Sequence, residues 1–193
     1  MNLVKKNNPT YHEEKLEEIR YGLESIYLTY TKIFVIFVLA YFLGIIKETL
    51  LLLLTYNIIR TFAFGIHATK SIYCLITSLM LFIGGVYIVK YMSLNIYVKT
   101  IISIMLLICI YKYAPADTYK RPLINERKRK KYKVISTILG IAYVILIIIL
   151  NNNIISNYLL IGMLESVIMI HPLIYKIFNL PFDNYKKYKL NTV

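Results

Sequence analysis

The sequence is poor in charge, and most of the charge that it has is of one sign. Only 17% of its 193 residues are charged, with 10 acidic against 23 basic residues, whereas soluble domains average about 25% charged residues. Seven glycines and five prolines are too few for a collagen-like or linker-rich chain. Two cysteines, with no metal-site spacing, do not form a metal signature or a disulfide framework.

Long apolar runs take the place of the missing charge. Hydrophobic residues make up 58% of the chain, and about 20 helical residues cross the hydrocarbon core of a bilayer. Strands of a membrane β-barrel would be shorter and would alternate. The runs predict an all-α polytopic integral membrane protein with about six transmembrane helices, over residues 33–46, 49–59, 71–89, 91–111, 134–150 and 154–175. The first two runs also allow one crossing and an interfacial piece.

The N-terminal stretch reads as an amphipathic helix and not as a signal peptide. It carries five acidic residues and no early apolar core, and Thr10 and Glu13 have the spacing of a capping box. Such a helix would lie on the membrane surface or pack on a partner, or it would pack on the chain's own spans. The chain thus divides into a cytoplasmic or interfacial leader (1–32), a helical membrane domain (33–175, with a basic cytoplasmic loop at 112–133) and a basic cytoplasmic tail (176–193).

The basic residues are distributed unevenly between the two sides of the predicted bundle. With six spans, 20 of the 23 lysines and arginines fall on one side, and only Lys47, Lys90 and Lys99 fall on the other. The positive-inside rule puts the rich side in the cytoplasm, together with both termini. Because the orientation of the protein in the membrane explains the excess of basic residues, we expect no nucleic-acid partner. Tyrosine, with 19 residues, replaces the absent tryptophan as the interfacial aromatic residue.

His67 and Cys74 are the candidate catalytic pair, at the predicted cytoplasmic boundary of the membrane. A neighbouring histidine or cation makes a cysteine nucleophilic by stabilising its thiolate. On one continuous helix the two residues would share a face but lie about 10.5 Å apart, so contact requires His67 to lie outside the helix. Gly65 is where the chain can leave it. The alternative is that Cys74 merely packs and that His67 is a solvated side chain.

Three motifs follow one another along the chain. They are Arg-x6-His-Ala-x5-Cys-x3-Ser from Arg60 to Ser78, Tyr-Ala-Pro-Ala at 113–116 followed by Lys-Arg-Pro and the basic run 127–131, and Leu-x-Gly-x-Leu-Glu-Ser at 160–166. In this order and spacing they resemble the accessory gene regulator B (AgrB) family of Gram-positive bacteria, over roughly residues 10–180.

The resemblance implies a membrane cysteine endopeptidase that processes an AgrD-like quorum-sensing propeptide. Cys74 would be the nucleophile and His67 its general base and acid. The thiolate would expel the C-terminal fragment and leave an acyl-enzyme thioester, which a Cys or Ser of the bound peptide resolves into a thiolactone or lactone ring. The resemblance further implies the plasma membrane of a Gram-positive bacterium, a cytoplasmic-side active site, and no metal or cofactor. It leaves a homodimer open.

The remaining candidate site residues carry weaker signals. Arg60, Gly65 and Ser78 would shape or charge the site. Glu165 is the only acid in the last apolar run, so it is expected to act in structure or in orienting the substrate. The basic run is expected to set orientation and to contact lipid headgroups, or to recruit an acidic propeptide tail; it consists of Arg127, Lys128, Arg129, Lys130 and Lys131.

Two other functions fit the same composition. A small membrane transporter or exporter would use Glu165, Lys47 and Lys99 in a polar path, although the sequence has no internal repeat and no pair of Gly/Pro-broken spans. A non-enzymatic membrane adaptor would need only the basic run to hold it at the bilayer.

Overall fold

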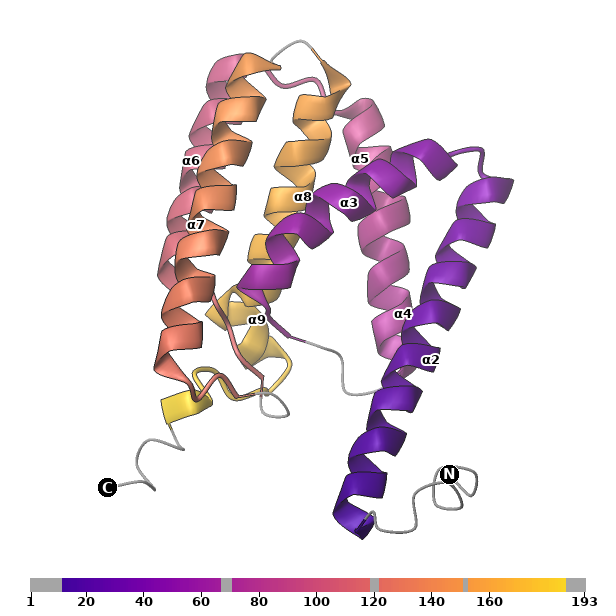
Figure 1. Cartoon of the computed structure of the whole chain (residues 1–193). Helices are drawn as coiled ribbons and strands as arrows, with labels where there is room; N and C mark the ends of the chain where they lie inside the picture. Colours follow the sequence, from indigo (N-terminus) through magenta and orange to yellow (C-terminus); the bar gives the residue numbers. More distant parts are fainter. Residues whose placement is uncertain (1–11, 67–70, 119–121, 151–152, 187–193) are drawn as a thin grey trace.

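The computed structural model describes residues 12–66, 71–118, 122–150 and 153–186, and these ranges are almost entirely helical (Figure 1). An isolated parallel bridge joins Phe64 and Ala116, and the described ranges hold no named strand. The all-α prediction is therefore confirmed. The helices are α2 (Glu13–Phe42), α3 (Ile46–Ala63), α4 (Ser71–Leu79), the π-helical η1 (Met80–Gly84), α5 (Gly85–Tyr91), α6 (Ile96–Tyr113), α7 (Glu126–Ile149), α8 (Ile154–Ile170) and α9 (Pro172–Ile177).

Three helical stretches are long and apolar enough to cross a membrane, namely Ile72–Tyr91, Ile96–Tyr113 and Glu126–Ile149. Two shorter apolar helices, Thr29–Phe42 and Ile154–Ile170, accompany them in the described part of the chain. A helix suits a bilayer because it satisfies its own backbone hydrogen bonds. The total of six spans stays a prediction, because α3 carries charge near both of its ends.

The predicted leader and the first apolar run form one helix. α2 continues without a break from Glu13 to Phe42, so no helix ends at residue 32, and the division into a leader and a membrane domain stays a prediction. The chain turns at Gly44, whose φ of 66° is in the left-handed region that glycine tolerates. Residues 27–59 therefore form two helices. The sequence put the interruption at Lys47 and Glu48, but Glu48 lies in the first turn of α3, where the helix dipole favours an acid.

Asparagine side chains begin three of the helices. Asn95 accepts a hydrogen bond from the N–H of Val98 (3.0 Å), and Asn125 accepts one from the N–H of Lys128 (3.1 Å). Asn153 caps α8 in the same way. These caps satisfy N–H groups that have no partner within the helix, and so they set where α6, α7 and α8 start.

α8 lies at the centre of the bundle. Nearly all of its residues are buried, whereas the other helices expose many large apolar side chains, as lipid-facing helices do. α3 crosses α8 closely at Gly162, where an added Cβ would lie 3.0 Å from the backbone of Thr55. The hydroxyl of Tyr143 on α7 donates to the Thr55 carbonyl (2.7 Å). Close contact through glycine and a buried hydrogen bond together fix these three helices.

The helix ends fall into two groups at opposite ends of the bundle (Figure 1). The start of α2, the end of α3, the starts of α4 and α7, and α9 lie at one end. The turn between α2 and α3 and the links from α5 to α6 and from α7 to α8 lie at the other. The basic run, in the first turns of α7, and Cys74, near the start of α4, are therefore at the same end. That this end faces the cytoplasm stays a prediction.

Candidate active site

The chain leaves α3 in a short extended segment that is held on both sides. The Gly65 N–H donates to the carbonyl of Ala116 (2.8 Å), and the Ala116 N–H donates to the carbonyl of Ala63 (2.9 Å). On the other side, the Ile66 N–H donates to the carbonyl of Met169 at the end of α8 (3.0 Å). The Tyr-Ala-Pro-Ala motif thus supplies the partner for the segment that leads into His67.

Arg60 holds the same segment from within α3. Its Nη2 donates to the carbonyl of Ile66 (2.5 Å), and its Nη1 is buried without a hydrogen-bond partner among the described residues. The guanidinium therefore closes a loop from the last turn of α3 to the residue just before His67. This contact fixes the backbone of the segment, and the site-shaping role of Arg60 stays a prediction.

Only glycine fits the backbone conformation and the surroundings of position 65. Its φ is 113°, which L side chains rarely adopt. An added Cβ would collide with Nη1 of Arg60 and with the Met169 carbonyl oxygen, and would lie 2.9 Å from the Met169 carbonyl carbon. The structure ends α3 at Ala63, so the helix stops where the sequence predicted a break.

Cys74 lies in the wall of a cavity of about 620 Å³. The walls come from α2, α3, α4 with η1, and the region from the end of α8 through α9 to Leu180. The lining is mainly apolar, from Ile36 and Phe82 to Met169. Nine of the 21 lining residues carry a polar group: Thr29, Lys32, Tyr56, Asn57, Arg60, Tyr73, Cys74, Thr77 and Ser78. An apolar cavity with a few convergent polar groups is typical of a binding site.

Two side chains contact Cys74 directly. Nζ of Lys32, from α2, lies 3.1 Å from Sγ of Cys74. Ser78 donates from Oγ to the Cys74 carbonyl at 2.8 Å, one helical turn away. Ser78 therefore holds the backbone and does not reach the sulfur. Cys74 itself is half-buried and is not in a disulfide.

His67 lies outside the described residues, so its position relative to Cys74 stays a prediction. The described helices stop at Ala63 before it and begin again at Ser71 after it. The structure does bring Arg60, Cys74 and Ser78 to one cavity.

Glu165 does not line this cavity. It is buried in α8 and packs against Gly85 of α5. A Cβ added to Gly85 would lie 2.6 Å from Oε1 of Glu165. No described residue donates a hydrogen bond to its Oε2. Lys99, which the transporter alternative needs in a polar path, is buried and donates to Ser156 (2.8 Å). Glu165 thus packs between helices, and its functional role stays a prediction.

The basic run is helical and largely exposed. α7 begins at Glu126, so the predicted loop of 112–133 ends at Asn125 and residues 127–131 form the first turns of a helix. Arg129 alone in this run is half-buried. Its guanidinium lies 3.6 Å from the ring centre of Tyr185 and 3.8 Å from the carboxylate of Glu126. Within the described ranges no three His, Cys, Asp or Glu side chains gather as a metal site.

Asp117 is a structural residue that the sequence did not single out. Its buried carboxylate accepts hydrogen bonds from the N–H groups of Asn184 (2.9 Å) and Tyr185 (2.8 Å), and more weakly from that of Leu123 (3.3 Å). Its carbonyl accepts one from the Tyr175 hydroxyl (3.0 Å). Asp117 thereby joins the segment after Tyr-Ala-Pro-Ala to α9 and the C-terminal turn, and this turn supports the loop that holds Gly65.

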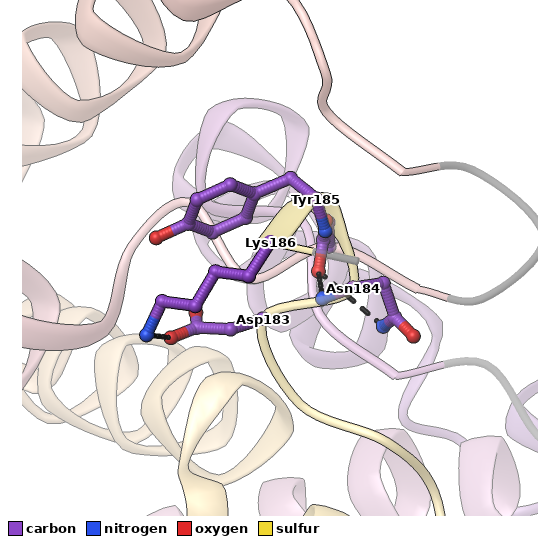
Figure 2. A network of polar contacts seen from close by, with 5 residues as sticks. Asp183, Asn184, Tyr185 and Lys186 are labelled. Carbon is purple, nitrogen blue, oxygen red and sulfur yellow. Dashed lines mark hydrogen bonds and ion pairs between the residues drawn. The ribbon is translucent and has the colours of Figure 1, made fainter. Parts of the chain in front are cut away.

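The C-terminal turn is also braced by an exposed ion pair. Nζ of Lys186 lies 2.6 Å from the carboxylate of Asp183 (Figure 2). This hydrogen bond, with the attraction of the charge, raises the pKa of Lys186. Because the pair faces water, we expect it to add little to stability.

Replacing Asp117 with alanine is expected to destabilise the protein strongly. Two short backbone hydrogen bonds to a buried carboxylate would be lost, one of them from the buried Asn184 N–H, a cost on the order of 3 kcal/mol. Thermal unfolding of the purified protein in detergent measures the effect. Asp183→Asn, which removes a charge from the same turn at a positive φ that asparagine tolerates, should leave the melting temperature nearly unchanged. Equal losses in the two variants would contradict the role given to Asp117.

The two residues that the sequence did not reveal differ in the signal that they carry. Asp117 follows directly on Tyr-Ala-Pro-Ala and is the only acid between Glu48 and Glu126, which marks it as unusual. Lys32 is one of five basic residues in the first 32 positions, and nothing local distinguishes it. Its contact with Cys74 joins residues 42 positions apart and is set by helix packing alone.

Comparison with known proteins agrees with the motifs. The sequence profile of the family described as Accessory gene regulator B matches residues 1–170. A "Putative AgrB-like protein" of Clostridium acetobutylicum is 30% identical over 175 residues, which cover 91% of this chain and 84% of that protein. A "Putative AgrB-like protein" of Listeria innocua is 31% identical over 190 residues, or 97% and 92% of the two chains.

An "Accessory gene regulator protein B" of Staphylococcus aureus is 33% identical over 173 residues, which cover 89% of this chain and 90% of that protein. No solved structure matches. The similarity runs through the segments that build the cavity, from α2 to the end of α8. The chain therefore belongs to the accessory gene regulator B (AgrB) family.

Proposed function

We propose that this protein is a membrane cysteine endopeptidase that cleaves the C-terminal part of a quorum-sensing propeptide and promotes cyclisation of the remainder. Membership of the AgrB family supports a role in the accessory gene regulator system. The proposal adds the chemistry: an acyl-enzyme thioester on Cys74 that a Cys or Ser of the bound peptide resolves into a thiolactone or lactone.

The position of Cys74 is the observation that carries this proposal. Its sulfur lies in the wall of a cavity large enough for several side chains of a peptide, with an ammonium group 3.1 Å away. The segment 64–66, which leads into His67, borders the same cavity through Ile66 and is fixed by hydrogen bonds on both sides. A fixed approach to His67 favours its use as a base, because proton transfer depends on geometry first.

The apolar lining also fits the proposed second step. In the first step the Cys74 thiolate attacks the peptide carbonyl, and His67 gives a proton to the leaving amine. In the second, a thiol or hydroxyl of the bound peptide attacks the thioester while His67 takes its proton. Water would compete for the thioester, and the mainly apolar lining of the cavity limits that competition.

The basic run, Arg127 to Lys131, would attract an acidic propeptide tail to the end of the bundle that holds Cys74. Four of its five members are exposed on the first turns of α7, where an incoming chain can meet them: Arg127, Lys128, Lys130 and Lys131. Replacing these four with glutamine should slow cleavage at low salt, and added salt should narrow the difference in rate from the wild-type protein because it screens the attraction. A defect of the same size at every salt concentration would contradict recruitment.

Co-expression with a propeptide tests the proposed function. Release of the C-terminal fragment and of a product lighter than the linear peptide by one water is followed by mass spectrometry. The wild-type protein and Cys109→Ala should form both, since Cys109 lies half-buried on α6 away from the cavity lining. Cys74→Ala should form neither. Cleavage by Cys74→Ala would overturn the proposal.

A further inference from the structure

We propose that Lys32 is a catalytic residue, whose ammonium group is the counter-ion of the Cys74 thiolate before attack and after release of the acyl group. The inference rests on the proposed function, since it assigns a role within that reaction. It adds to the cysteine and histidine a third group that comes from the N-terminal helix.

The geometry aims Lys32 at the sulfur. Lys32 lies on the face of α2 that forms a cavity wall together with Thr29, Ile33 and Ile36, at the spacing of successive helical turns. α2 packs here on α3, α4 and η1, and the half-buried Lys32 reaches across to place Nζ 3.1 Å from Sγ of Cys74. This is within the range of a hydrogen bond to sulfur.

The surroundings of Lys32 indicate an anionic partner. No described carboxylate forms an ion pair with Lys32, and its one described hydrogen bond goes to Cys74. The other charged group of the cavity lining is Arg60, which is also a cation. Lys32 is half-buried in a mainly apolar cavity wall, and a cation in such surroundings is stabilised by a negative charge nearby. A thiolate at Cys74 provides that charge.

The role follows from the balance of the reaction. The thiolate forms the S–C bond and loses its charge as the peptide C–N bond breaks, with the proton for the leaving amine coming from His67. When the bound thiol or hydroxyl attacks the thioester, its proton passes to His67, the C–S bond breaks, and the thiolate returns. Lys32 keeps its protons throughout. It stabilises the attacking group at the start and the leaving group at the end.

Alkylation of Cys74 tests this role without a propeptide. Two cysteines are present in the whole chain, so Cys109→Ser leaves Cys74 as the single thiol. The full-length protein in phospholipid vesicles is treated with iodoacetamide at pH 7, and the rate is followed by intact mass. Lys32→Met should lower the rate by about tenfold, the size of one charge-assisted hydrogen bond. Lys32→Arg, which keeps the positive charge, should retain most of the alkylation rate.

Two controls keep the result interpretable. Lys47→Met removes an exposed lysine at the opposite end of the bundle and should not change the rate. If Lys32→Met has a lower melting temperature than the Cys109→Ser protein, Lys32→Gln is compared with Lys32→Arg instead. The Lys32→Gln variant should then be alkylated more slowly than Lys32→Arg. Equal rates for the charged and neutral variants would overturn the proposal.

Cleavage assays separate this inference from the proposed function. Loss of alkylation and of cleavage in Lys32→Met supports both. Normal cleavage by Lys32→Met overturns the role of Lys32 and leaves the peptidase intact. A Lys32-dependent alkylation rate in a wild-type protein that cleaves no propeptide overturns the peptidase, and with it the catalytic use of the pair.

Discussion

Replacing Cys74 with alanine is expected to lower the rate of propeptide cleavage by at least about 10³-fold, and adding His67→Ala should cost almost nothing more. A nucleophile and its general base act as one unit, so losing either removes the whole covalent route. If the two residues contributed independently, the losses would multiply. Rates for the two single variants and the double variant, measured in the same vesicles by fragment release, distinguish these cases.

The comparison also tests the position of His67. His67 lies outside the described residues, between α3, which ends at Ala63, and α4, which begins at Ser71; contact with Cys74 requires it to lie closer than the spacing of about 10.5 Å on a continuous helix. Multiplying losses would mean that His67 acts elsewhere than on Cys74. Cys109→Ala, in the other cysteine of the chain, provides the matched control and should cleave at the wild-type rate.

Gly65→Ala is expected to lower cleavage by about 10²-fold while leaving the protein folded. A Cβ at this position meets Arg60 and Met169 at once, so the segment leading into His67 must shift. Displacing a catalytic group by about 1 Å can cost 10²-fold in rate. Cleavage rate and melting temperature, measured on the same preparation, separate the loss of activity from the loss of stability.

Gly44→Ala is a close control for that experiment. Gly44 also has a positive φ, of 66°, but an added Cβ there meets nothing within 4 Å, and its turn lies at the opposite end of the bundle. Gly44→Ala should lower the free energy of unfolding by about 1 kcal/mol, because alanine is strained at a positive φ. It should cleave the propeptide at the wild-type rate. Similar cleavage by the two variants would contradict the part given to Gly65.

The helical architecture and the polar centre of the cavity could be read from local features. Long apolar runs predict helices because the bilayer leaves the backbone no other partner. The break after α3 was marked by Gly65, and Arg60, Cys74 and Ser78 lie within 19 positions of one another. Cys74 and Ser78 are one turn apart on α4, whereas Arg60 lies on α3 and reaches the same cavity through the packing of the two helices.

Long-range packing decided the rest. The contact between Lys32 and Cys74 depends on the angle at which α2 approaches α4, and that angle follows from side chains along both helices. Asp117 meets residues 184 and 185 only after α8 and α9 have returned the chain. The sequence also did not show that the polar leader and the first apolar run share one unbroken helix, α2.

Trapping the acyl-enzyme tests the central claim most directly. A propeptide whose ring-forming Cys or Ser is replaced by alanine can still be cleaved but cannot close the ring, so the thioester should accumulate. Intact mass spectrometry should then find the N-terminal part of the propeptide attached to the protein, hydroxylamine should release it, and peptide mapping should place it on Cys74. Cleavage that leaves Cys74 as a free thiol throughout, or an adduct on another residue, would contradict the mechanism.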